Sequence, residues 1–204
     1  NSETIWYSTK CKKNIHYCAL PIEVDGVKTI AEYYENGDLL GKINIPLIGK
    51  HNLSNVLGAI SICRRIGISL NALEKVLQKI NTPKRRFEFK GFWKGRQIID
   101  DYAHHPSEIK ATIAMAKIII KSQKTHLPKK PKRLIIVFQP HRYSRTKDLL
   151  NEFSLSFRDS DAICLLPIYS AGEEPINGIS SEALQLLLES HYPNTKINLV
   201  KNYK

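Results

Sequence analysis

The chain has 204 residues, 42% of them hydrophobic, which suits one or two domains with buried cores. Its 31 Lys and Arg against 19 Asp and Glu give a net charge of +12, but no aromatic residues interleave with the densest basic cluster, 129–133. A solvated basic surface is therefore favoured over nucleic-acid binding. The longest apolar runs, such as 134–138, are too short to span a bilayer, so we expect no membrane insertion.

The four cysteines lack the CxxC spacing that is typical of metal or redox motifs. Cys11, His16 and Cys18 lie close in sequence, but a fourth ligand is missing and the spacing fits no common zinc pattern. We therefore expect reduced thiols, no metal site and a cytoplasmic protein.

The first part of the chain, up to about Pro83, carries signals for strands and then for helices. A strand is expected over 4–9, and Asn36-Gly37 separates two strand-like runs, which is typical of a hairpin. Gly67 lies where the C-terminal cap of one helix belongs, and Ser69 caps the start of the next. The hairpin strands are expected over 27–34 and 39–45, and the buried helix faces are expected to contain Leu53, Val56, Leu57, Ile60 and Cys63, then Leu70, Leu73, Val76, Leu77 and Ile80.

After Pro83 the pattern changes to alternating strands and helices. Lys94-Gly95 joins the runs 87–93 and 96–101 into a second hairpin, and the unbroken apolar run 133–138 predicts a parallel strand buried on both faces. Such alternation predicts right-handed crossovers and an α/β fold with a doubly wound, mostly parallel sheet. The later strands are expected over 161–166 and 196–200, and the helices at Pro106, at Thr146 and at Ser180 or Ser181, with Ile109, Ile113, Ala116 and Ile120 inward in the first.

Three polar segments follow the carboxyl ends of successive predicted strands: 101–106, 140–145 and 169–173. Parallel strands place such segments at one edge of the sheet, where ligands bind in open α/β folds. Arg142 and Arg145 would bring guanidinium forks that suit carboxylates and phosphates. Together with the nearby imidazoles and carboxylates, they indicate a site for an amino-acid carboxylate or for a phosphoryl group in transfer.

Each candidate residue also has a plainer interpretation. Asn52 at a helix start suits an N-cap, Arg86 suits ordinary surface charge, and His104 with His105 suits capping of the following helix. Arg142 and Arg145, three apart in a loop, suit solvated charges, and Glu173 with its neighbour Glu174 before a proline suits a turn. The residues taken singly leave these alternatives open.

Taken together and in order, five motifs resemble the Mur ligases, and the resemblance covers nearly the whole chain. It implies that residues 1–83 form the α+β tail of a central ATPase domain, and that 84–204 form most of a Rossmann-like C-terminal domain without its last strand. The family's GxxGKT loop, magnesium ligands and UDP-binding domain are absent here, so we expect a fragment that is inactive alone. The motifs are His51-Asn52-x-x-Asn55-x-x-x-Ala59, Arg85-Arg86-Phe87, DDYAHHPSE (100–108), VFQPHRYSRT (137–146) and YSAGE (169–173).

The resemblance also implies a reaction, nearest to the family branch that joins L-alanine to UDP-N-acetylmuramate through an acyl phosphate in bacterial peptidoglycan synthesis. ATP and Mg²⁺ are the implied cofactors of the full-length enzyme. The implied ATP-binding residues are Asn52, Arg86 and Asp101. The implied amino-acid-binding residues are Tyr102, His104, Arg142 and Arg145, with His104 also the catalytic candidate.

Three other functions compete with this interpretation. A recycling ligase, which attaches a tripeptide to the same sugar nucleotide, shares the histidine and arginine motifs but more often has phenylalanine where Tyr102 stands. A nucleic-acid-binding module is supported by charge alone, and steeply salt-dependent binding would favour it. A non-catalytic binding domain is the third. The sequence carries no prediction of oligomeric state.

Overall fold

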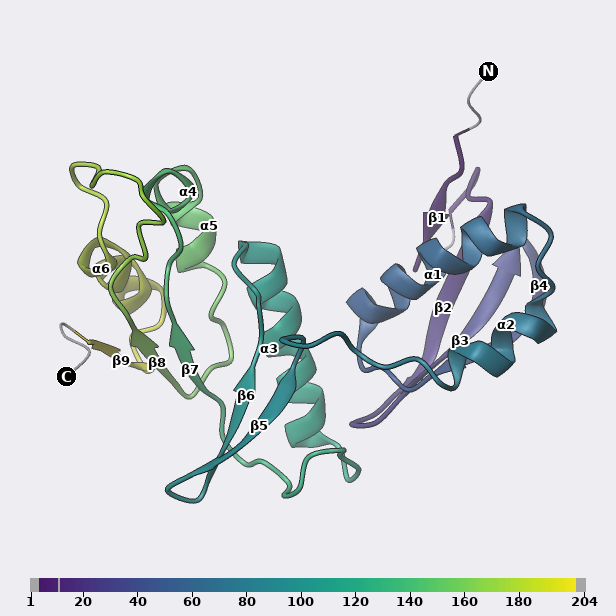
Figure 1. The fold of residues 1–204 in the computed structure, drawn as a ribbon, viewed down its shortest axis with the longest axis horizontal. Coiled ribbons are helices and arrows are strands. Elements are labelled where there is room, and N and C mark those ends of the chain that lie inside the picture. The colour runs from purple at the N-terminus through teal and green to yellow at the C-terminus, as the bar shows by residue number, and fades with distance from the viewer. Residues whose placement is uncertain (1–3, 11, 201–204) are drawn as a thin grey trace. The chain divides into compact units, whose positions relative to one another are not determined.

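The computed structural model describes residues 4–10 and 12–200 (Figure 1). The chain forms two compact units, Asn1–Lys84 with Ile118–Lys130 (unit 1) and Arg85–Lys117 with Pro131–Lys204 (unit 2). The first division lies one residue from the boundary expected after Pro83, whereas the segment 118–130, expected in the second domain, groups with unit 1. The match of these units to family domains stays a prediction.

Unit 1 is built on a four-stranded sheet in the order β1-β2-β3-β4. β1 pairs with β2 in parallel, and the other pairs are antiparallel. The Asn36-Gly37 hairpin is confirmed, with both residues at positive φ (49° and 98°), as a tight hairpin turn requires. The strands are β1 (Tyr7–Ser8), β2 (Tyr17–Val24), β3 (Thr29–Glu35) and β4 (Asp38–Ile45).

Two of these strands differ from the sequence prediction. The strand expected over 4–9 is only two residues long, and β2 was not predicted because Pro21 interrupts its apolar pattern. A shift of register between Pro21 and Glu23 accommodates the proline within the pairing with β3.

Two helices pack on this sheet, α1 (Lys50–Arg65) and α2 (Leu70–Leu77). The predicted caps are confirmed: Gly67, at φ 90°, donates its N–H to the Arg64 carbonyl at 3.0 Å, and the Ser69 hydroxyl accepts from an N–H of α2. The predicted buried faces are confirmed except at Val76, which is 59% exposed because it lies off the stripe of Leu73 and Leu77. The core contains Ala19, Ala31, Tyr33, Ile43, Ile45, Leu53, Leu57, Ile60, Leu73 and Leu77.

The segment 118–130 belongs to unit 1 because it is anchored on the turn between β2 and β3. The Ser122 hydroxyl accepts from the Gly26 N–H at 3.0 Å, and the Lys124 ammonium lies 3.3 Å from the Asp25 carboxylate. Only glycine fits at position 26, since a Cβ there would lie 1.9 Å from the Lys124 carbonyl oxygen.

A partly buried carboxylate joins the sheet of unit 1 to α1. Glu35 accepts hydrogen bonds from the Tyr33 hydroxyl at 2.8 Å and from the Arg64 guanidinium. The Glu35 and Arg64 side chains are only 19% and 22% exposed. The Arg64 hydrogen bond, aided by Tyr33, lowers the pKa of Glu35 despite its burial, so the carboxylate is the form that stabilises the fold.

We expect Glu35→Gln to lower the free energy of unfolding by about 1–3 kcal/mol at neutral pH, because Arg64 loses its charged partner. Since the folded pKa of Glu35 lies below the ordinary 4.5, its contribution is present above pH 4.5 and is lost as pH falls through the folded value. Urea denaturation between pH 3 and 7 measures both effects. Glu32→Gln is the matched control on the same strand, since Glu32 accepts from the Tyr34 hydroxyl in a separate pair that does not include Arg64. Equal losses for both variants would contradict the prediction.

Unit 2 begins with an antiparallel hairpin, β5 (Glu88–Trp93) and β6 (Arg96–Asp100), as predicted. A parallel sheet in the order β7-β8-β9 follows, and this confirms the α/β class. The helix expected from Thr146 is two short helices that begin earlier, with a break at Leu149 (φ −120°). The remaining elements are α3 (Pro106–Lys121), β7 (Ile135–Phe138), α4 (Tyr143–Asp148), α5 (Leu150–Ser154), β8 (Ala162–Leu165), α6 (Ser181–His191) and β9 (Lys196–Leu199).

The core of unit 2 lies on one face of the parallel sheet. The prediction that strand 133–138 is buried on both faces is wrong: Ile135 and Val137 are 48% and 65% exposed, because the described helices pack on the opposite face. Within α3 the buried position near its end is Ile119 rather than Ile120. The core residues are Ile109, Ile113, Phe138, Phe153, Phe157, Ile163, Leu165, Leu184 and Leu188.

The cysteines only partly follow expectation. Cys18 forms a disulfide, whereas Cys63 and Cys164 are free thiols, so the prediction of reduced thiols is wrong for Cys18; Cys11 lies outside the described residues. Spacing along the chain does not report which sulfurs the fold brings within bonding distance. Across residues 4–10 and 12–200, no group of three His, Cys, Asp or Glu could hold a metal ion, and no helix is long and apolar enough to cross a membrane.

Candidate functional site

Asp101, just past the end of β6, accepts hydrogen bonds from three parts of unit 2. One carboxylate oxygen accepts from the Phe87 N–H at 2.8 Å, and the other accepts from the Ala103 N–H at 2.9 Å and from the Thr112 hydroxyl at 3.1 Å. The loop before β5, the turn after β6 and helix α3 are therefore held at one point. A carboxylate has about four lone-pair sites, so one site remains for a further donor such as a ribose hydroxyl.

Tyr102 and His104 lie side by side on this turn. Their rings meet edge to face with centroids 5.0 Å apart, and the Arg85 guanidinium stacks over the Tyr102 ring at 4.7 Å. The Tyr102 N–H donates to the Arg85 carbonyl at 2.8 Å, which fixes the backbone, while the phenol ring is 51% exposed. The His104 ring contacts its own turn through Nδ1, 2.8 Å from the Tyr102 carbonyl oxygen.

The start of α3 is capped by its own sequence. Glu108 accepts from the N–H groups of His104 and His105 at 3.0 and 3.2 Å, in the manner of a capping box. Burial alone would raise the pKa of Glu108, but these N–H groups, the His104 ring and Arg86 lower it overall. Arg86 lies 3.9 Å from the Glu108 carboxylate and is half exposed, so the structure brings this ATP-binding candidate beside the turn that holds Asp101 and His104.

The second candidate segment follows β7 and lies against the loop after β8. The His141 and Tyr169 rings pack with centroids 5.4 Å apart, and the Arg142 N–H donates to the Tyr169 carbonyl at 2.8 Å. Arg145 approaches the His141 ring, with its guanidinium 3.5 Å from Nδ1. The prediction that segments 140–145 and 169–173 lie together at one edge of the parallel sheet is thereby confirmed. The prediction that segment 101–106 follows a strand of the same sheet is wrong, because β6 pairs with β5 in a separate antiparallel sheet.

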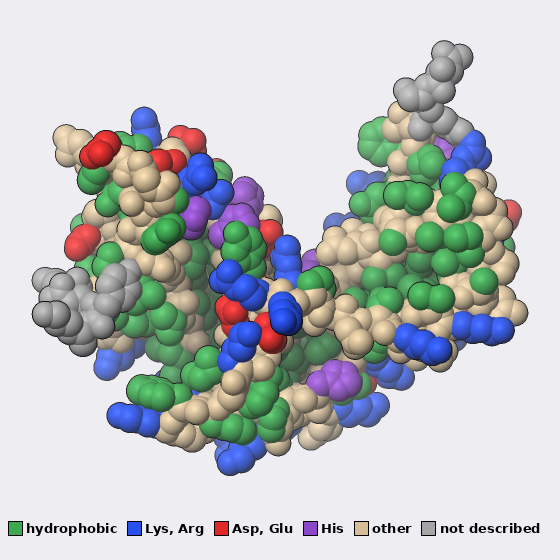
Figure 2. Space-filling view, in the orientation of Figure 1, with side chains coloured by type: hydrophobic (Ala, Val, Ile, Leu, Met, Phe, Trp, Pro, Cys, Tyr) green, Lys and Arg blue, Asp and Glu red, His purple; other side chains and the backbone are tan. Residues whose placement is uncertain are grey.

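The electrostatics of this edge favour an anion. Burial lowers the pKa of His141, and the positive charges of Arg145 and Arg142 lower it further, so the ring is neutral at pH 7. Figure 2 shows histidine and Lys or Arg side chains gathered near the start of α3 and near α4. Two guanidinium forks beside imidazoles, with Arg142 half exposed, suit a carboxylate or phosphate ligand.

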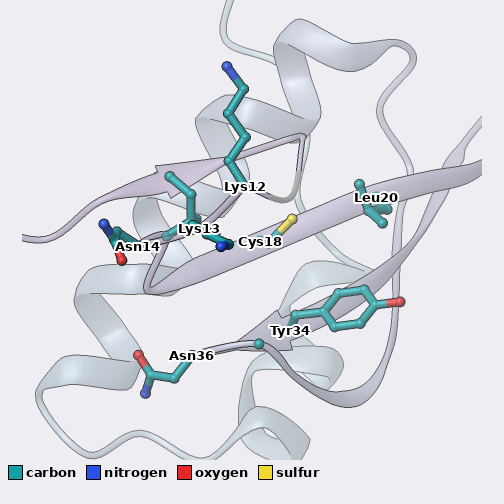
Figure 3. A pocket seen from close by; sticks show the side chains of 9 residues that line it. Lys12, Lys13, Asn14, Cys18, Leu20, Tyr34 and Asn36 are labelled. Atoms are coloured by element: carbon teal, nitrogen blue, oxygen red, sulfur yellow. The ribbon is translucent and has the colours of Figure 1, made fainter.

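The remaining ATP-binding candidate, Asn52, lies in the first turn of α1 in unit 1. Its amide nitrogen donates to the Ile48 carbonyl at 2.9 Å. The plainer interpretation of Asn52 as an N-cap is wrong, because Gly49 is the N-cap of α1 and, among the described residues, no side chain caps this helix. A pocket of about 340 Å³ elsewhere in unit 1 contains none of the predicted site residues. Its labelled lining side chains are Lys12, Lys13, Asn14, Cys18, Leu20, Tyr34 and Asn36 (Figure 3).

Sequence reasoning did not single out three residues that shape this edge. His141 and Tyr169 lie inside the quoted motifs but received no role, and Glu173 was interpreted mainly as part of a turn. Their position in the loops after two parallel strands predicted that they lie at this edge, but residue type and spacing do not indicate which of these side chains contact one another.

The family of the chain follows from its match to known proteins. The family described as "Mur ligase, glutamate ligase domain" matches residues 85–203, more than half of the chain. The chain therefore belongs to the Mur ligase family. Two solved structures share its fold at about 20% identity. A UDP-N-acetylmuramate–alanine ligase from Thermotoga maritima has a TM-score of 0.68, covering 93% of this chain and 38% of its own, and a murein peptide ligase from Psychrobacter arcticus has a TM-score of 0.59, covering 93% and 37%.

Curated relatives are more similar in sequence and carry one name. A UDP-N-acetylmuramate–L-alanine ligase of Prochlorococcus marinus (strain MIT 9303) is 48% identical over 98% of this chain, and one of Synechococcus sp. (strain CC9311) is 49% identical over 89%. The chain spans about 41% and 38% of the lengths of these relatives.

Proposed function

We propose that the chain is part of a full-length, cytoplasmic bacterial ligase that joins L-alanine to UDP-N-acetylmuramate at the expense of ATP in peptidoglycan synthesis. The observation that carries the proposal is 48% identity, along nearly the whole chain, to a relative named for that reaction. The two guanidinium groups of Arg142 and Arg145, beside His141, support it, because an amino acid must be held by its carboxylate while its amine reacts.

In the proposed reaction, ATP first converts the lactyl carboxylate of the sugar nucleotide into an acyl phosphate. The amine of L-alanine then attacks the acyl carbon, a C–N bond forms, the C–O bond to phosphate breaks, and the nitrogen loses its proton. Arg142 and Arg145 hold the alanine carboxylate, and Tyr102 lines the same site. His104 orients the amine or stabilises charge on the departing phosphate.

Asn52, Arg86 and Asp101 are the proposed contacts to ATP. The free lone-pair site of Asp101 suits one ribose hydroxyl, and the half-exposed guanidinium of Arg86 suits a phosphate. Mg²⁺ belongs to the proposal as the companion of ATP, with its ligands and the phosphate-binding loop supplied by parts of the enzyme outside this sequence.

The test is phosphate release by the full-length ligase with ATP, Mg²⁺ and UDP-N-acetylmuramate, adding L-alanine in one series and the tripeptide in another. Release that depends on L-alanine is the expected result. Release with the tripeptide alone would move the chain to the recycling ligases, and no release with either would reject a ligase function.

A further inference from the structure

Glu173, in the loop after β8, binds the loop that carries Arg142. Its carboxylate accepts from the Ser144 N–H at 2.9 Å and from the Ser144 hydroxyl at 2.7 Å. It also lies 3.9 Å from the Arg142 guanidinium. The two hydrogen bonds from Ser144 lower the pKa of Glu173, and Arg142 adds to this, so Glu173 is charged at neutral pH.

The backbone of Arg142 needs such support because its conformation is strained. Its φ of 71° and ψ of 138° are disfavoured for a residue with a side chain. The Arg142 N–H is held by the Tyr169 carbonyl at 2.8 Å, and the Arg142 carbonyl accepts from the buried Thr146 hydroxyl at 2.7 Å. Glu173 fixes the chain between these points, at Ser144.

The contact with Arg142 orients the guanidinium without using up its donors. A separation of 3.9 Å is an ion pair beyond hydrogen-bonding distance, so N–H groups stay available for a second carboxylate. The Glu173 carboxylate is already committed to Ser144, which keeps it from closing on the guanidinium. The arrangement therefore presents a cation that is held in place but not neutralised.

We propose that Glu173 is a positioning residue, which clamps the loop after β7 through Ser144 and thereby presents the Arg142 guanidinium to the carboxylate of the incoming amino acid. This inference rests on the proposed function. It assigns Glu173 no contact with substrate: its effect on catalysis passes through Arg142.

The first test is steady-state kinetics of the full-length ligase with Glu173→Ala. We expect the KM for L-alanine to rise roughly tenfold or more, as loss of hydrogen bonds to a charged group implies, while the KM for ATP changes less than about twofold. Glu173→Gln, which keeps one acceptor for Ser144, should recover part of the loss. Glu174→Ala removes the exposed neighbouring carboxylate and is the matched control, expected to leave both constants unchanged.

A double-mutant cycle separates positioning from general stabilisation. If Glu173 acts through Arg142, then Glu173→Ala adds little to the alanine KM once Arg142 is alanine. If the two substitutions raise the alanine KM by factors that multiply in the double variant, the inference is overturned. It is also overturned if Arg142→Ala raises the alanine KM and Glu173→Ala does not.

Amide hydrogen exchange at Ser144 tests the clamp without catalysis. Faster exchange at Ser144 in Glu173→Ala than in Glu174→Ala is expected. Equal exchange in the two variants would overturn the inference even in an active ligase. If phosphate release by the wild-type ligase does not depend on L-alanine, the proposed function is refuted instead. The exchange result then still decides whether Glu173 holds the loop after β7. Should Glu173→Ala fail to fold, Ser144→Ala removes the 2.7 Å hydrogen bond alone and is read in the same two assays.

Discussion

Arg142→Ala in the full-length ligase is expected to lower kcat/KM for L-alanine about 100-fold, because a charge-assisted, two-pronged contact to a carboxylate contributes about 2–3 kcal/mol. The guanidinium is half exposed at the edge shared by the loops after β7 and β8, and its backbone is held in a strained conformation. Most of the loss should be in the alanine KM, since the contact is made in the ground state as well as in the transition state.

Arg142→Lys refines this prediction. Lysine keeps the charge but lacks the planar fork, so we expect it to recover only part of the loss. Lys147→Ala, an exposed cation on α4, is the control for charge and should leave the alanine KM unchanged. An unchanged alanine KM in Arg142→Ala would remove Arg142 from the carboxylate site.

The parts of the fold that the sequence predicted are those with short-range causes. The Asn36-Gly37 turn, the Gly67 and Ser69 caps and the alternation that gives the parallel sheet all depend on residues within a few positions of one another. β2 was missed for the same reason: Pro21 is a local signal against a strand, and the shift of register that accommodates it arises only through pairing with β3.

The candidate site was predicted where residue type carries the chemistry, and missed where geometry does. Arg142 stands out as a cation after a strand, whichever partner it has. Glu173 has a local context, Glu-Glu-Pro, that predicts a turn, and its contacts are 29 residues away at Ser144. The strained backbone at Arg142 is likewise set by partners distant in sequence, which no local pattern encodes.

Asp101 shows how one residue type supports two interpretations. The family resemblance implies an acid near the ATP ribose, whereas the structure shows a carboxylate that already accepts three hydrogen bonds from unit 2. These roles are compatible because a fourth lone-pair site remains, but they predict different consequences of substitution. A residue that only contacts ATP would leave stability unchanged when removed.

We therefore expect Asp101→Ala to lower the free energy of unfolding of unit 2 by about 2–4 kcal/mol, since the N–H groups of Phe87 and Ala103 and the Thr112 hydroxyl all lose a charged acceptor. Urea denaturation followed by tryptophan fluorescence measures the loss, because Trp93 lies in the β5–β6 hairpin that precedes this turn.

Asp100→Ala is the matched control for Asp101→Ala. The Asp100 carboxylate, 31% exposed, pairs at 3.2 Å with an Arg85 side chain that is 56% exposed, and such surface pairs contribute about 0–1 kcal/mol. A small loss for Asp100→Ala with a large one for Asp101→Ala would establish the carboxylate of Asp101 as the point that holds the turn. Similar small losses for both would mean that water replaces the three hydrogen bonds of Asp101 without cost, and the shape of the turn would then depend on the capping of α3 by Glu108. The KM for ATP of the full-length ligase tests the proposed contact between Asp101 and the ribose. If Asp101→Asn raises this KM more than Asp100→Asn does, the contact is supported independently of stability.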